Sequence, residues 1–164
     1  MKIALIQQKC TNNRELNRQK GLDAVRKAAD QGANVLCFAE LGFDPFYPQV
    51  IATEDKLKLA EPIPGPTTEI FSGLAKDLDI VIILNLFERD GNHTYDTSPV
   101  INSNGSLLGT TRMVHITDYD CFHEQGYYHP GDHGAPEVKE SFAKQLFIPD
   151  RRPELYADWL VKNS

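Results

Sequence analysis

A carboxylate follows directly on an apolar run in the first third of the chain. Residues 34–39 contain Val-Leu-Cys-Phe, which is typical of a strand covered on both faces, and the run ends on Glu40. Ligand crevices of open α/β sheets lie beyond the carboxyl ends of such strands, so Glu40 is predicted to line a site. Partial burial there would raise the pKa of its carboxylate and suit it to act as a general base. The alternative is a solvated acid at a strand end.

A second concentration of reactive side chains lies between residues 115 and 133. It consists of imidazoles, carboxylates and one thiol: His115, Asp118, Asp120, Cys121, His123, Glu124, His129, Asp132 and His133. These are metal-ligand types, but neither C-x-x-C nor H-E-x-x-H spacing occurs, so we expect an ordinary polar loop with no metal and no cofactor. Cys121, near His123 and Glu124, could instead be a nucleophile beside its base, or an inert loop thiol.

Alternating strand and helix patterns position these residues and predict an α/β fold with parallel neighbours. The expected order is β-α-β-α-β-β-β, with strands at 2–7, 34–39, 80–87, 98–101 and 107–114. A first helix is expected from the helical spacing of Leu16, Leu22, Val25 and Ala29, a second over 66–78, and a short helix at 53–59. Asn12 and Asn13 offer N-cap side chains to the first helix, Gly32 fits its C-terminal end, and Asn104-Gly105 predicts a hairpin tip. An irregular loop over 115–136 follows, then a helix at 137–147 and a last short helix or docked tail at 154–161.

Length and composition narrow the classes of protein. The 164 residues fit one domain, and a formal charge of −6 argues against a nucleic-acid partner. We expect no membrane span, because no apolar run approaches the ~20 residues that one requires, and no signal peptide, because the apolar start is too short. The three cysteines, Cys10, Cys37 and Cys121, are too sparse for a disulfide scaffold and predict a cytoplasmic protein.

The order of short segments along the chain resembles the nitrilase (carbon–nitrogen hydrolase) superfamily, and is most similar to its N-carbamoyl amine and amide hydrolase branch. The segments that carry the resemblance are Lys2-Ile3-Ala4-Leu5-Ile6-Gln7, Phe38-Ala39-Glu40-Leu41, Pro62-Ile63-Pro64-Gly65-Pro66-Thr67-Thr68, Asn102 to Gly109 with Arg112-Met113-Val114-His115-Ile116, Glu124 to Tyr128 with Pro130-Gly131-Asp132, and Asp150 to Tyr156. The resemblance implies a four-layer α-β-β-α sandwich. It also implies a reaction in which a cysteine attacks an amide, nitrile or carbamoyl carbon, a glutamate acts as base, a lysine stabilises the oxyanion and a second glutamate supports the site.

Two of these four roles have matching residues in this chain. The base matches Glu40 and the supporting acid matches Glu124, whereas Met113 stands where the family has its lysine, with Arg112 as a weak surrogate. The segment that carries the nucleophilic cysteine is absent, as if deleted between about 136 and 138, and Cys121 is the only nearby surrogate. The chain is therefore expected to be a single shortened domain, with residues 1–136 as a first half and 137–164 as a C-terminal helix and tail.

The sequence thus predicts a carbon–nitrogen hydrolase relative that is weakened or inactive toward amides, nitriles or N-carbamoyl compounds. The alternative is a non-catalytic binding or assembly module of the same fold. Since half of a sandwich would leave apolar sheet surface uncovered, we expect a homo-oligomer. A nucleotide-binding α/β domain is a third class, but the glycine-rich phosphate motifs are lacking.

Overall fold

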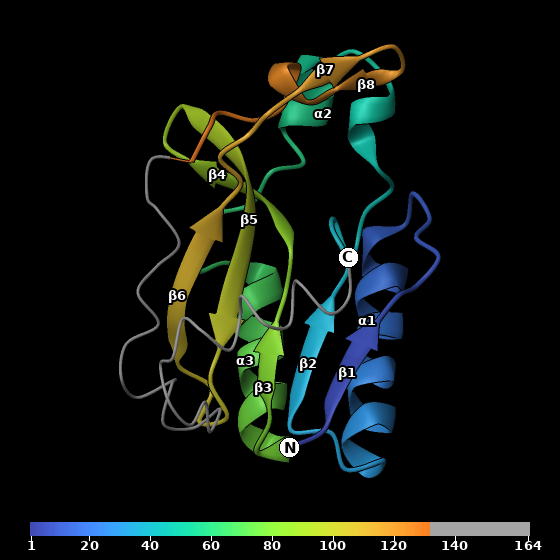
Figure 1. Cartoon of the computed structure of the whole chain (residues 1–164), viewed down its shortest axis with the longest axis vertical. Helices are drawn as coiled ribbons and strands as arrows, with labels where there is room; N and C mark the ends of the chain where they lie inside the picture. Colours follow the sequence, from blue (N-terminus) through green and yellow to red (C-terminus); the bar gives the residue numbers. More distant parts are fainter. Residues whose placement is uncertain (132–164) are drawn as a thin grey trace, which may run out of the picture.

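Residues 1–131 are described by the computed structural model, and a six-stranded sheet organises them (Figure 1). The strand order is β1-β2-β3-β5-β4, and β6 pairs with the other edge of β5. The strands are β1 (Ile3–Ile6), β2 (Val35–Phe38), β3 (Val81–Ile83), β4 (Leu86–Asp90), β5 (His93–Ile101) and β6 (Leu107–Arg112). The first three are parallel, and β5 is antiparallel to each of its neighbours. The predicted α/β class is confirmed.

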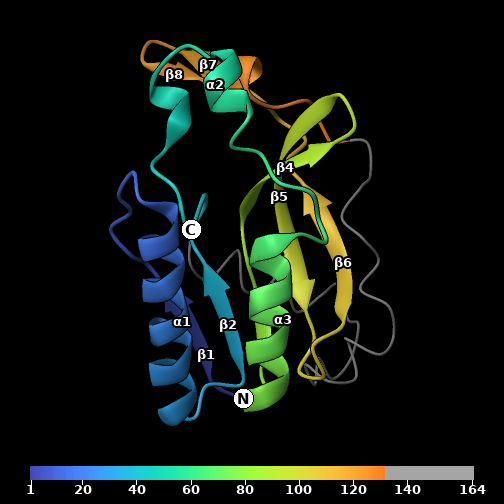
Figure 2. The same cartoon turned by 180° about the vertical axis from the view of Figure 1, so that it is seen from behind.

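Helices α1 (Arg14–Asp30) and α3 (Pro66–Leu78) cover one face of the sheet, as Figure 2 shows. The Asn13 side chain accepts from the N–H of Leu16 at 3.0 Å and caps α1, and Gly32 follows the helix with a left-handed φ of 81°. These helices pack on one set of alternating strand side chains, and the rings of Phe38, Phe43 and Phe71 meet in this core. The cap and helix predictions are confirmed for this part of the chain.

The opposite face of the sheet has its own row of apolar side chains. It consists of Ile3 and Leu5 of β1, Val35 and Cys37 of β2, Val81 and Ile83 of β3, Val100 of β5 and Leu108 of β6. Ile3 is 56% exposed and Leu5 is 81% exposed, although both lie on strand β1 at the edge of the sheet. Figure 1 views the molecule from this side, with both long helices behind the sheet.

The single strand predicted over 80–87 is wrong in one respect, because the chain leaves the ladder between Ile83 and Leu86. Both β3 and β4 pair with the same edge of β5, and Asn85 stands at the break between them. Consequently β5 begins at His93, earlier than the predicted start at residue 98. The hairpin between β5 and β6 is confirmed, with Gly105 at a left-handed φ of 85° at its tip.

Short elements form a cap beyond the carboxyl ends of β1 and β2 (Figure 1). They are η1 (Tyr47–Gln49), α2 (Glu54–Leu57), β7 (Asp118–Tyr119), β8 (Phe122–His123) and η2 (Glu124–Gly126). The prediction of an irregular loop from residue 115 therefore needs correction, because a small hairpin and a 3-10 turn form there. The cap rests on a buried aromatic cluster, whose buried members are Leu41, Tyr47, Ala60, Phe87, Tyr127 and Tyr128.

The predicted helix at 137–147 and the tail at 154–161 lie outside the described residues. Within residues 1–131, none of the helices combines the length and the apolar character that a membrane crossing requires.

Candidate active site

Glu40 lies at the end of β2, in a tight turn that faces the cap. The next residue, Leu41, has a left-handed φ of 46°, a conformation that a bulky side chain rarely adopts and that costs of order 1–3 kcal/mol. Its N–H donates to the Oδ1 atom of Asn85 at 2.7 Å, and the N–H of Gly42 donates to the backbone oxygen of Asn85 at 3.3 Å. The break between β3 and β4 therefore fixes the turn that carries Glu40.

Asn85 also connects this turn to Asp96 in the middle of β5. Its amide nitrogen donates to Asp96 Oδ1 at 2.7 Å and to the hydroxyl of Ser98 at 3.1 Å. Asp96 is paired with Phe87 in the ladder, so it points to the face that carries the aromatic cluster. Asp96 is only 5% exposed, and its second oxygen, Oδ2, has no hydrogen-bond partner within residues 1–131.

Glu124 reaches the same region from the cap. It begins η2 and is 4% exposed, and its Oε2 accepts from the N–H of Thr117 at 3.3 Å. Its backbone oxygen accepts from the N–H groups of Tyr127 and Tyr128, at 2.8 and 2.9 Å. The packing of Tyr128 against Phe87, with ring centroids 5.5 Å apart, joins the turn to the sheet. The structure thus brings the predicted pair, Glu40 and Glu124, toward the same group of side chains.

The pKa shifts show that three carboxylates interact. Although Glu40 as a residue is exposed, burial by surrounding protein raises the pKa of its carboxyl, and the Glu124 charge raises it further. Burial raises the pKa of Asp96 from 3.8 to about 7, its hydrogen bond from Asn85 lowers it, and the charges of Glu40 and Glu124 raise it. Burial first, and then Asp96, Glu40 and Glu124, also raise the pKa of the Tyr128 phenol. A carboxyl with a raised pKa is suited to proton transfer near neutral pH.

A pocket of about 330 Å³ opens beside Glu40. It is lined by Ile6, Gln8, Cys10, Ala39, Glu40, Leu41, Gly42, Asp44, Pro45, Phe46 and Gln49. The Cys10 thiol faces the Gly42 carbonyl oxygen at 3.3 Å, and burial raises the pKa of this thiol, which disfavours the thiolate. The volume suits a small molecule that would approach Glu40 directly.

The surrogate residues lie elsewhere. Arg112 pairs with Thr97 across the ladder, on the face of β5 opposite Asp96. Its guanidinium donates to Glu88 and Asp90 and lies 3.8 Å from the centroid of the Tyr95 ring.

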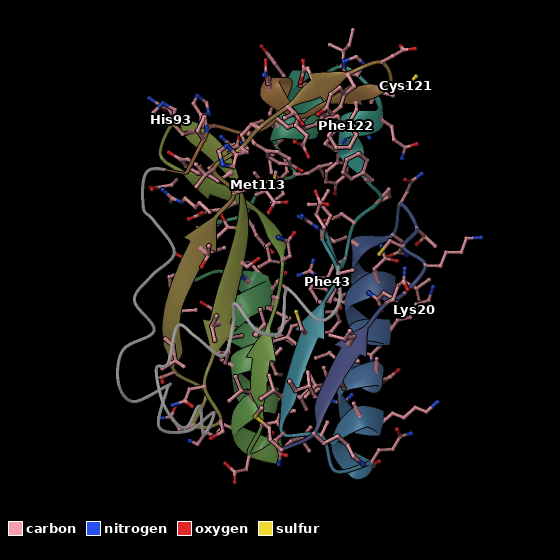
Figure 3. The ribbon with its side chains drawn as sticks, in the orientation of Figure 1. Lys20, Phe43, His93, Met113, Cys121 and Phe122 are labelled. Carbon is pink, nitrogen blue, oxygen red and sulfur yellow. The ribbon has the colours of Figure 1, made fainter. Side chains whose placement is uncertain are left out.

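Cys121 is exposed at the turn between β7 and β8, where its sulfur lies 3.9 Å from Asp120 Oδ1. In Figure 3 Cys121 stands at the outer edge of the cap, whereas Met113 lies at the end of the sheet below it. The structure brings neither surrogate to the three carboxylates.

Met113, in contrast, is bonded to the strand that carries Asp96. Its N–H donates to the backbone oxygen of Asp96 at 2.9 Å, and its side chain packs against the aromatic cluster. Within residues 1–131, no group of three or more His, Cys, Asp or Glu side chains is arranged to hold a metal ion.

Sequence reasoning missed Asn85, Asp96 and Tyr128. Asn85 has a signal that could have found it, since it is a polar residue inside the most apolar run of the chain. Asp96 likewise is the one charged residue in the run Tyr-Asp-Thr-Ser-Pro-Val-Ile, which covers residues 95–101. A buried amide or carboxylate in a strand requires a partner, and here each supplies the partner of the other.

Comparison with known proteins gives a consistent result. The carbon-nitrogen hydrolase family model matches residues 2–146. N-carbamoylputrescine amidase of Solanum lycopersicum is 34% identical over 143 residues, covering 87% of this chain and 47% of that protein. Citrullinase of Francisella tularensis is 30% identical over 147 residues, covering 88% of this chain and 50% of that protein. A carbon-nitrogen hydrolase structure from Helicobacter pylori G27 superposes with a TM-score of 0.74 at 26% identity, over 80% of this chain and 45% of that one. The chain thus spans about half the length of the curated relatives it matches.

The role of Asn85 can be tested by its removal. The Asn85→Ala substitution leaves the buried N–H of Leu41 and the Asp96 carboxyl without their partner, so we expect the free energy of unfolding to fall by about 2–3 kcal/mol. Urea unfolding followed by circular dichroism measures this. Asn104→Ala is the matched control, since it removes an exposed amide with one local hydrogen bond and should change stability by less than ~1 kcal/mol. Equal stability of the two variants would contradict the assigned role.

The raised pKa of Asp96 predicts a pH dependence. A carboxyl with a pKa of 3.8 when unfolded and about 7 when folded favours the folded state most at low pH. The contribution of Asp96 to stability therefore falls as the pH rises from about 4 to about 7 and is constant above that range. The Asp96→Asn variant lacks this titration and should gain at least about 1 kcal/mol relative to the unmodified protein between pH 5 and pH 8.

Urea unfolding at several pH values measures this difference. Asp55→Asn, at a side chain that is 92% exposed, is the matched control and should show no such gain. A difference between Asp96→Asn and the unmodified protein that stays constant over the interval would show that Asp96 does not titrate near neutral pH.

Proposed function

The chain belongs to the carbon-nitrogen hydrolase family, and from this premise we propose that it is a weakened or inactive relative of the enzymes that hydrolyse amides and N-carbamoyl compounds. The observation that carries the proposal is the electrostatic interaction of Glu40 with Glu124, the two positions that match the base and the supporting acid of the family. Glu40 stands at the wall of a pocket with the volume for a small molecule. The ligand that we propose for this pocket is a small amide, nitrile or N-carbamoyl compound.

Glu40 has the properties that a general base requires. Its carboxyl is at the mouth of the site, and its raised pKa increases its basicity. Glu124 is buried, and its negative charge contributes to that raised pKa. In this arrangement Glu40 accepts the proton of an attacking group, and Glu124 keeps Glu40 basic.

The proposal of weak or absent activity rests on the other two roles, those of the oxyanion donor and of the nucleophile. Met113 donates its backbone N–H to the backbone oxygen of Asp96, and its thioether side chain donates no hydrogen bond to an oxyanion. Loss of a single oxyanion donor costs about 10²–10³-fold in kcat in other hydrolases. The Cys121 sulfur is exposed on the cap, and the pKa of the Cys10 thiol is raised, so neither is an activated nucleophile.

The cellular setting belongs to the same proposal. All three cysteines are free thiols in the structure. Because exposed and half-buried thiols persist best in a reducing compartment, we place the protein in the cytoplasm.

Hydrolysis assays test the catalytic proposal. We expect ammonia release from simple amides and N-carbamoyl amines to be weak or undetectable, and any release to fall by about 10²-fold or more in Glu40→Gln, because that variant lacks the base. Coupled enzymatic detection of ammonia measures the rate, and Cys121→Ala should leave it unchanged. The control Glu15→Gln alters an exposed acid on α1. Turnover that survives in Glu40→Gln would refute the assigned base, and turnover lost in Cys121→Ala would identify Cys121 as the nucleophile.

A second candidate function, assembly through the sheet, is supported by its apolar face. Ile3 and Leu5 lie exposed on the edge strand β1, on the side opposite α1 and α3. An edge strand with exposed apolar side chains and free backbone groups is a site at which another chain can add. We propose that two copies of this chain associate across this edge and face.

Light scattering coupled to size-exclusion chromatography tests the association. The Leu5→Lys substitution places a charge at an 81% exposed apolar position, so we expect it to shift a dimer or larger oligomer toward monomer. The matched control is Ile70→Lys, at a 41% exposed position on α3, which should leave the mass unchanged. A stable monomer for the unmodified protein would exclude the assembly proposal.

A further inference from the structure

We propose that Gln8 is a positioning residue for Glu40, because its side chain joins the two walls of the pocket beside that carboxylate. One wall is the turn after β2, to which Glu40, Leu41 and Gly42 belong, and the other is the loop after β1, to which Gln8 and Cys10 belong. The inference rests on the proposed function, in which Glu40 is the base, and it adds a residue that acts through the backbone of the turn.

The side-chain amide of Gln8 bridges two backbone carbonyl groups. Its Nε2 atom donates to the Gly42 oxygen at 2.8 Å and to the Asn17 oxygen at 3.1 Å. A primary amide has two N–H donors, so both are used in these bonds. Rotating the amide by half a turn would place its own oxygen against two carbonyl oxygens, and the donor is therefore fixed in place. In this way the end of β1 is joined to α1 and to the turn after β2.

Gly42 is held at both of its backbone polar groups. Its N–H donates to the backbone oxygen of Asn85 at 3.3 Å, and its oxygen accepts from Gln8 Nε2 and faces the Cys10 sulfur at 3.3 Å. A thiol is a weak donor, so Gln8 supplies the main bond on the oxygen side. The packing here is close, since a Cβ atom at Gly42 would lie only 3.1 Å from the Cβ of Phe38. Asn85 and Gln8 thus restrain the turn through the two polar groups of one residue.

The next carbonyl of the turn is held in the same way. The Nδ2 atom of Asn17, a fully buried residue, donates to the Phe43 oxygen at 2.8 Å and to the Thr11 oxygen at 2.6 Å. Phe43 itself packs in the core near the end of β2 (Figure 3). Side chains supply these donors because neither the Gly42 nor the Phe43 carbonyl belongs to a strand, and buried carbonyls require partners. Gln8, which is only half-buried, is the one of these two amides that can be replaced without opening the core.

Removing the Gln8 amide should change the surroundings of Glu40 as well as the turn. The Gly42 oxygen would retain the Cys10 thiol as its donor among residues 1–131, and a carbonyl left without a strong donor turns toward water. Water would then reach the neighbouring Glu40 more easily. Since burial is the largest cause of the raised pKa of Glu40, that pKa should fall toward its ordinary value.

Two variants of the full chain separate the hydrogen bonds of Gln8 from its bulk. Gln8→Met keeps an unbranched side chain of similar length without N–H donors, and Gln8→Ala removes the bulk as well. By NMR hydrogen exchange, we expect the Leu41 N–H to exchange about tenfold faster in both variants, whereas the Ile82 N–H, in the middle of the sheet, keeps its rate. Carbon-13 NMR should show a lower pKa of the Glu40 carboxyl in Gln8→Ala. The matched control is Gln7→Ala at the exposed neighbouring position, which should change neither quantity.

Exchange at Leu41 that is unchanged in both variants would overturn the positioning role. Equal acceleration at Leu41 and Ile82 would show that Gln8 stabilises only the fold as a whole, and an unchanged pKa of Glu40 would show that the turn does not control its surroundings. Either result would overturn the role as well. Neither measurement requires turnover, so the role of Gln8 is tested whether or not the chain hydrolyses amides. Ammonia release that falls in Glu40→Gln and is unchanged in Gln8→Ala would keep the assigned base and overturn the role of Gln8 alone.

Discussion

The side chain of Asn85 is the connection on which the candidate site depends. It accepts from the N–H of Leu41 in the turn after β2 and donates to Asp96 on β5. The sheet does not pair these two elements directly, since β3 lies between β2 and β5. The left-handed backbone at Leu41 costs free energy, and the buried hydrogen bond that its N–H donates to Asn85 Oδ1 offsets this cost. The turn that carries Glu40 is therefore tied to β5 through Asn85.

The strands on either side of the break at Asn85 also determine which charged side chains lie on the same face of the sheet. Side chains alternate between the two faces of the sheet along each strand. Asp96 and its ladder partner Phe87 therefore lie on one face, whereas Glu88, Thr97 and Arg112 lie on the other. The Arg112 guanidinium binds both oxygens of Glu88, with distances of 2.8 Å, and removing Arg112 would leave the buried Glu88 carboxylate without its ion pair. Arg112 thus stabilises the fold on one face and leaves the electrostatics of the other face to the acids.

Local patterns were sufficient for most of the fold and for placing Glu40 at the end of a buried strand. The apolar run before Glu40, the Asn13 cap and the Asn104-Gly105 tip are signals that act over a few residues, and each predicts an element that the structure contains. The break at Asn85 is different, because it depends on partners 44 and 11 residues away, at Leu41 and Asp96. The small β7–β8 hairpin likewise depends on contacts with the loop after β2, such as the Phe46–Phe122 ring pair at 5.1 Å. Sequence periodicity carries no information on such long-range contacts.

The resulting site differs from that of an amide hydrolase in the sign of its charge. Attack on a carbonyl develops negative charge on oxygen, and that charge is stabilised only where a fixed donor or cation faces it. Here burial raises the pKa values of the Glu40 and Asp96 carboxyls, the charge of Glu124 raises both further, and Met113 supplies no compensating charge. An oxyanion forming among these carboxylates would be repelled, whereas a cation would be attracted by the same field.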